Sequence, residues 1–274
     1  MSSIEIMPAR LTREEAEDLR RAIACLEATS FAQRLTDALG KPVGALGSAL
    51  PAPARRAIAH ATESALSAAT RLAFRTIDLN KPAQPSNRAH KFAAAASGAL
   101  GGAFGLAALP VELPVSTAIL LRSIAQIARE EGEDLGAPDA AFACVEVFAL
   151  GKGSSEPAYE SGYFAVRAAL AKSVTDSARF VATQGAAAQS APMVVRLISQ
   201  IAARFGLIVS EKVAAQAAPV FGALGGAAVN AVFAEHFQTL ARGHFIVRRL
   251  ERTHGASLVR FEYQRLSGET ARAA

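Results

Sequence analysis

Apolar residues recur at helical spacing through most of this chain. Thr12 is followed three residues later by Glu15, in the arrangement of a capping box that opens a helix. Apolar residues then return on one helical face as far as Leu39. Gly40 and Pro42 follow directly, and both residue types stop helices. The pattern therefore predicts one helix between Thr12 and Gly40.

The same spacing predicts helices along the rest of the chain. The next runs from Arg55 to about Ile77, and a linker with two prolines follows at residues 80–87. Further helices are predicted over residues 116–131, 138–150, 161–184 and 194–205. Gly132 suits the position after a helix end, and Pro138 suits the first turn of the helix after it. Residues 258–265 alternate as a strand would, but no partner strand is evident, so their structure stays open.

The hexapeptide Gly-Ala-Leu-Gly-Gly-Ala occurs twice, at residues 98–103 and 222–227. Each copy lies in a long uncharged stretch, with a lysine before it and a glutamate after it (Lys91 and Glu112, Lys212 and Glu235). We interpret this as an internal duplication of one glycine-rich helical unit, over residues 90–132 and 211–255. A break at Pro110–Pro114 is expected in the first unit, and a single long bent helix in the second.

Glycines four residues apart allow two helices to approach closely. The glycines expected to form such a seam are Gly98, Gly101, Gly102, Gly105, Gly222, Gly225 and Gly226.

The first uncharged stretch, residues 92–111, has the length of a membrane span but only six strongly apolar residues. Those residues favour insertion by about 3 kcal/mol in total, which a single central charge would cancel. We therefore favour two glycine-rich helices packed in the centre of a bundle. Reversible contact with lipid and a two-span arrangement are the alternatives.

Composition supports a compact, all-α, multi-helix bundle. Hydrophobic residues make up 51% of the chain but aromatic residues only 6%, and tryptophan is absent. Much of the remainder is alanine, which favours helices and buries little area. We expect an N-terminal helical segment at 1–79, a main helical domain at 80–266, and a disordered tail at 267–274.

The two cysteines have no CxxC partner, so neither a disulfide framework nor a zinc knuckle is predicted. The first residues lack the layout of a signal peptide. The predicted location is therefore the cytoplasm or its membrane face.

The net charge of +5 is concentrated near the C-terminus, where seven arginines face three glutamates from Arg242 onward. Such a segment is typical either of a solvated helix end or of contact with an anionic membrane surface. Nucleic acid is a less suitable partner, because no aromatic motif accompanies the arginines.

Two carboxylates stand in apolar surroundings. Glu112 is bracketed by prolines and is either a first-turn acid of the following helix or a group that holds a cation. Glu146 lies among Cys144, Val145 and Val147, so it must be paired or have a raised pKa. These two are the candidate catalytic residues. The candidate ligand-binding residues are Arg122, Tyr163, Arg167 and His244.

A mixed carboxylate and histidine metal site is conceivable from Glu112, Glu235 and His236, although no HExxH or ExxH spacing supports it. The chain contains no Gly-x-Ser-x-Gly motif, no P-loop and no dinucleotide fingerprint. The sequence therefore indicates neither a reaction nor a cofactor.

Several blocks together resemble the EcsC family. They lie at residues 98–105, 112–117, 120–129, 132–134, 146–151, 222–227, 236–238 and 241–245. The likeness covers roughly residues 80–265. It implies a bacterial helical protein, in a family named after a protein encoded beside an ABC transporter linked to secretion. It supplies no catalytic residues to carry over.

We therefore expect a non-enzymatic accessory protein at the cytoplasmic membrane face, which binds lipid or a membrane partner through its glycine-rich hairpin. The alternative is a ligand-binding protein or metal-dependent enzyme with a polar pocket inside the bundle.

Overall fold

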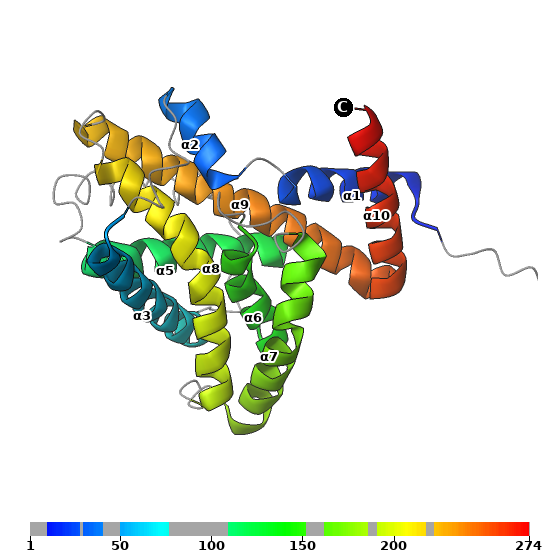
Figure 1. The fold of residues 1–274 in the computed structure, drawn as a ribbon. Coiled ribbons are helices and arrows are strands. Elements are labelled where there is room, and N and C mark those ends of the chain that lie inside the picture. Colours follow the sequence, from blue (N-terminus) through cyan, green and yellow to red (C-terminus); the bar gives the residue numbers. More distant parts are fainter. Residues whose placement is uncertain are drawn as a thin grey trace, which may run out of the picture.

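The computed structural model describes residues 10–27, 30–40, 50–76, 109–151, 162–185, 191–217 and 222–273. Within these ranges the chain is all-α, as predicted (Figure 1). Its elements are α1 (Arg13–Leu26), α2 (Phe31–Leu39), α3 (Ala52–Thr76), α5 (Leu109–Glu130), α6 (Pro138–Glu146), the short 3-10 helix η2 (Val147–Ala149), α7 (Tyr163–Gln184), α8 (Pro192–Ala217), α9 (Gly222–His254) and α10 (Ala256–Ala273).

The long helix α9 organises the fold. Its 33 residues span about 50 Å. Figure 1 shows α1, α2 and α10 on one side of α9, and α3, α5, α6 and α7 on the other. Helices α1, α2, α5, α8 and α10 all contact α9, while α3 packs on α5 and α8. One continuous core results, which runs from Leu19 in α1 to Leu266 in α10. The predicted segments 1–79 and 80–266 both contribute to it.

The N-terminal region contains two helices where one was predicted. The capping box is confirmed, because Thr12 Oγ1 accepts from Glu15 N and the Glu15 carboxylate accepts from Thr12 N. However, α1 ends at Leu26, and Ser30 opens α2 by accepting from Gln33 N. Periodicity alone missed this break, because the apolar face continues across it with Phe31 and Leu35 buried. Gly40, with φ of 67°, ends α2 as predicted.

The predicted helix break at Pro110–Pro114 is wrong. Helix α5 begins at Leu109 and continues through Pro114. Pro110 lies in the first turn, where no N–H partner is available in any case, and Pro114 lies only one turn further on. At the other end, Gly132 is confirmed as the residue after the helix. Its φ is 77°, and the N–H groups of Gly132 and Glu133 donate to the carbonyls of Arg129 and Ala128.

The second glycine-rich unit is divided between two helices. Helix α8 extends past its predicted end at Phe205 to Ala217, and α9 begins at Gly222. The predicted single helix from Glu211 is therefore wrong. Gly222, Gly225 and Gly226 lie at the start of α9. Gly98, Gly101, Gly102 and Gly105 lie outside the described residues, so the packing of the two units on each other stays a prediction.

The strand-like C-terminal segment is helical. Val259, Tyr263 and Leu266 are buried at helical spacing on one face of α10. Gly255, with φ of 85°, separates α10 from α9. Helix α10 also contains residues 267–273, which we expected in a disordered tail.

The structure describes a close helix approach at Gly243 of α9, outside the two hexapeptide copies. A Cβ atom there would lie 2.7 Å from Leu26 Cγ and 2.9 Å from the carbonyl oxygen of Ala22. Glycine is therefore required at this position for α1 to pack on α9.

Candidate functional site

A polar cluster is buried where α7 meets α9. The Tyr163 hydroxyl lies 3.0 Å from His244 Nδ1, and Arg167 donates to the same hydroxyl at 3.2 Å. Arg167 also forms a two-bond ion pair with Glu251, with distances of 2.8 and 2.9 Å. Three of the four predicted ligand-binding residues thus meet, although they are far apart in sequence. The fourth, Arg122, is exposed on α5.

These contacts favour one arrangement of the protons in the cluster. The Tyr163 oxygen accepts from Arg167 and has one proton to donate, and donation of that proton to His244 Nδ1 goes with an imidazole proton on Nε2. Nε2 is buried and has no hydrogen-bond partner among the described residues. Burial holds the pKa of His244 well below its ordinary value, and the charges of Arg167 and Arg248 lower it further. The imidazole is therefore neutral at physiological pH.

Glu146 lies at the buried end of α6, beside this cluster. Burial raises its pKa to about 7, although the charges of Arg167 and Arg248 oppose the rise and that of Glu251 adds to it. A carboxyl group with such a pKa can hold or release a proton near neutral pH. This arrangement brings Glu146 into the same electrostatic environment as Tyr163 and Arg167.

Glu133 extends the charged network, a role that sequence reasoning missed. Its carboxylate accepts from Arg248 at 2.7 and 3.1 Å and also from Arg252. Glu133 directly follows Gly132, so the end of α5 directs its side chain toward α9. Its sequence position resembles that of many solvated acids after a helix end, and only the packing of α5 on α9 distinguishes it.

The basic C-terminal region is largely paired with acids. Arg249 contacts Asp18 and Glu131, and Arg265 contacts Glu262 and Glu269. With Arg248 and Arg252 on Glu133, four of the seven arginines are engaged. These ion pairs lower the charge that the segment could offer to an anionic partner, and contact with a membrane surface stays a prediction.

A second buried polar group lies where α5, α8 and α9 meet. Lys212 Nζ lies 2.7 Å from Glu112 Oε1, and Asn230 Nδ2 lies 3.4 Å from the same oxygen. Lys212 also sits 4.8 Å above the ring of Phe233. Burial lowers the pKa of Lys212, while the charge of Glu112 opposes that shift. Glu112 is therefore an acid in the first turn of α5 that is also paired.

The three metal candidates are not brought together. Glu235 is exposed, whereas His236 is buried against Phe31, with ring centroids 5.4 Å apart. Burial lowers the pKa of His236 to about 3, and both ring nitrogens lack a hydrogen-bond partner in the described part of the chain. In that part, no three His, Cys, Asp or Glu side chains form a group that could hold a metal ion.

Among the described residues, two of the hollows that open on the surface lie between helices. One, of about 610 Å³, lies between α1 and α10, and the other, of about 520 Å³, lies between α7 and α8. Glu112, Glu146 and His236 line neither of them. The predicted polar residues of the bundle therefore contact other protein groups instead of these hollows.

Comparison with known proteins gives one family. A model of the EcsC protein family matches residues 14–250. The match begins in α1, so it includes N-terminal helices for which the sequence alone suggested no resemblance. No match is found among curated proteins or among solved structures.

Proposed function

This chain belongs to the EcsC protein family, and from that membership and its surface we propose a non-enzymatic accessory role at the cytoplasmic membrane face. In this proposal it binds lipid or a membrane partner through its glycine-rich end. We define this end as residues 109–116 of α5, 211–217 of α8 and 222–230 of α9. The contacts between Glu112, Lys212 and Asn230 place the three segments together.

One observation carries the proposal. Val111 and Val115 are 73% and 47% exposed on one face of α5, whereas Glu112 and Leu113 on the other face are buried. Five large apolar residues are exposed among those described, and two of them lie in this short segment. Single exposed apolar residues are common, but neighbouring ones favour contact with an apolar partner.

The apolar helices α5 and α8 support contact with a membrane surface more than they support a membrane-spanning arrangement. Helices α5 and α8 are long and apolar enough to cross a membrane, but core helices of other proteins share these properties. In α5, 67% of the most apolar window is buried within the protein. That burial would be lost if α5 crossed a bilayer.

Vesicle flotation tests the proposal with a matched pair of variants. Val115→Asp places a charge on the glycine-rich end. Val195→Asp places the same charge at an equally exposed valine, also 47%, near the opposite end of α8. We expect the chain to float with vesicles that contain anionic lipid, and only Val115→Asp to reduce the floated fraction severalfold. Absence of flotation at low and at physiological salt, or equal loss in both variants, would refute it.

The convergence of Glu146, Tyr163, Arg167 and His244 favours a second candidate function, ligand binding at a polar site inside the bundle. The metal-dependent form of this candidate has no such group of side chains behind it among the described residues. Metal analysis of the purified protein and of its Glu146→Gln variant separates the two candidate functions. A stoichiometric metal that the variant lacks would favour the second candidate over the first.

A further inference from the structure

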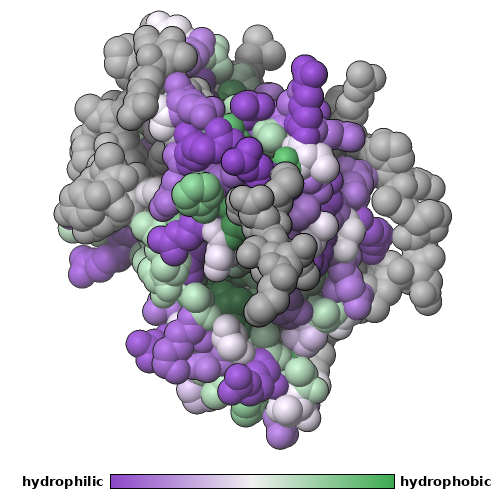
Figure 2. Space-filling model, turned by 90° about the vertical axis from the view of Figure 1, so that its right-hand side faces the viewer, coloured by the Kyte–Doolittle hydropathy of each residue, from purple (hydrophilic) through white to green (hydrophobic). Residues whose placement is uncertain are grey.

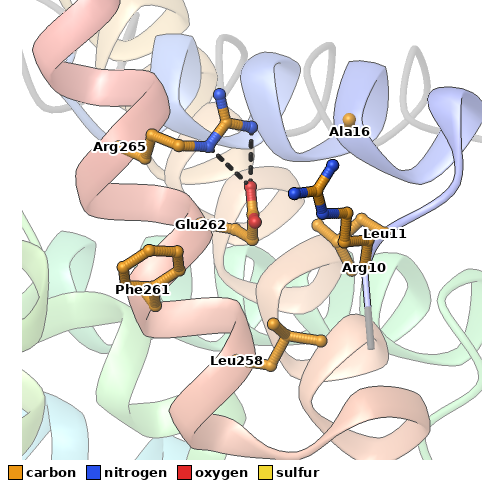
Figure 3. Close-up of a pocket in the computed structure, with 7 residues that line it drawn as sticks. All are labelled: Arg10, Leu11, Ala16, Leu258, Phe261, Glu262 and Arg265. Carbon is orange, nitrogen blue, oxygen red and sulfur yellow. Dashed lines mark hydrogen bonds and ion pairs between the residues drawn. The ribbon is translucent and has the colours of Figure 1, made fainter. Parts of the chain in front are cut away.

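The hollow between α1 and α10 combines charge with apolar surface. Figure 2 shows the molecule from this side, where hydrophilic and hydrophobic residues are interspersed. Arg10 and Leu11 line it just before α1, Ala16 lines it from α1, and α10 contributes Leu258, Phe261, Glu262 and Arg265. Figure 3 shows the guanidinium groups of Arg10 and Arg265 on either side of Glu262, with Phe261 and Leu258 below them. Its volume, about 610 Å³, lies in the range of small-molecule pockets.

The charges of this pocket leave one guanidinium available. Arg265 donates to Glu262 through Nε and Nη2, at 3.0 and 2.7 Å, and to Glu269 through Nη1 at 2.6 Å. Arg265 and Glu262 therefore satisfy each other. Arg10 is exposed and forms no hydrogen bond or ion pair with any described residue. A single guanidinium fork matches one planar carboxylate through two parallel hydrogen bonds.

The apolar side of the pocket favours a ligand that also carries a hydrocarbon chain. Phe261 is 62% exposed and is the only aromatic among the five large apolar residues exposed in the described ranges. Leu11 and Leu258 are partly buried beside it. A ligand that covers the ring of Phe261 removes apolar surface from water, which favours binding.

We propose that this pocket binds an amphiphilic monocarboxylate, with its carboxylate on Arg10 and its hydrocarbon chain against Phe261, Leu258 and Leu11. Six of the seven lining residues lie outside residues 14–250, the range that the family model matches. This binding does not rest on the proposed membrane role, because the pocket lies away from the glycine-rich end.

The absence of tryptophan from the chain provides a direct test. Phe261→Trp places a single fluorescent reporter in the pocket wall, and circular dichroism checks that the variant is folded. We expect decanoate to shift the tryptophan emission to the blue in a saturable way. Acetate has the charge without the chain, and decanol has the chain without the charge. Each should therefore bind more weakly than decanoate by a factor of about ten or greater.

Two further variants identify the group that binds the carboxylate. In the Phe261→Trp background, Arg10→Gln should raise the half-saturating concentration of decanoate about tenfold, as expected for the loss of a charged hydrogen bond. Arg260→Gln should leave it unchanged, because Arg260 lies over Phe164 and does not line the pocket. Calorimetry of the unmodified chain with decanoate provides a second measurement. No saturable signal in either assay, equal binding of decanol, or equal losses in the two arginine variants would overturn the proposal.

Discussion

Lys212 Nζ lies 2.7 Å from Glu112 Oε1, and the two side chains are only 1% and 6% exposed. In sequence, Glu112 follows the first glycine-rich copy and Lys212 precedes the second. The acid of one unit thus pairs with the base of the other. Glu235, the glutamate that follows the second copy, is exposed. The ion pair therefore joins α5 to α8 inside the protein, and the duplication of the two units stays a prediction.

Removal of one member of this pair should strongly destabilise the fold. Glu112→Gln leaves the Lys212 ammonium buried without its counter-charge, which typically costs about 3 to 5 kcal/mol. Urea unfolding followed by circular dichroism measures the loss. Glu235→Gln, the corresponding change at an exposed position, should alter the free energy of unfolding by less than about 0.5 kcal/mol. Equal effects of the two variants would show that the ion pair contributes little.

Glu146 should make the stability of the fold depend on pH. Its pKa rises from an ordinary 4.5 to about 7 in the folded state, so the folded state binds the proton more tightly than the unfolded state. Its contribution is fully present below pH 4.5 and is lost as the pH rises through 7. Relative to Glu146→Gln, the unchanged protein should lose up to about 3 kcal/mol over that interval. Urea titrations at several pH values measure this difference, and a difference that does not vary with pH would contradict the assignment.

The helices could largely be predicted from local signals, because Thr12, Gly132 and Pro138 act within one turn of their own positions. The errors lie where tertiary contacts decide the outcome. Residues 258–265 alternate like a strand, but the packing of α10 on α9 and α1 makes them helical. The break before Ser30 was hidden because the apolar face continues on both sides of it.

Tyr163 should be required for the hydrogen bonds at the α7–α9 junction. Tyr163→Phe removes the hydroxyl between Arg167 and His244 and leaves the buried Nδ1 of His244 without a partner. The expected cost is about 1 to 3 kcal/mol in the free energy of unfolding, measured with urea. Nitrogen NMR of the unchanged protein should place the imidazole proton on Nε2 and show no protonation down to the acid limit of folding. A proton on Nδ1 would contradict the proposed direction of the hydrogen bonds.

Tyr163, Arg167 and His244 could be listed from the sequence, because polar residues in apolar helices must find partners. Their arrangement could not. Tyr163 and His244 meet only because α7 and α9 pack at that register, and Glu251 and Glu133 look like ordinary solvated acids in the sequence. Burial, which is a property of the whole fold, separates them from such acids.

Among the glycines whose surroundings the structure describes, Gly243 has the least room for a side chain. Gly243→Ala would place a Cβ atom 2.9 Å from the carbonyl oxygen of Ala22 and 2.7 Å from Leu26 Cγ, and the backbone oxygen cannot move without shifting α1. We expect a loss of about 1 to 3 kcal/mol in the free energy of unfolding, despite the higher helix propensity of alanine. Gly268→Ala is the matched control, because its Cβ atom would meet no other atom within 4 Å. That variant should gain up to about 1 kcal/mol, since only helix propensity changes. Thermal and urea unfolding measure the change in the free energy of unfolding for both variants. We expect a loss for Gly243→Ala and a gain for Gly268→Ala. A gain in both would mean that α1 does not pack this closely on α9.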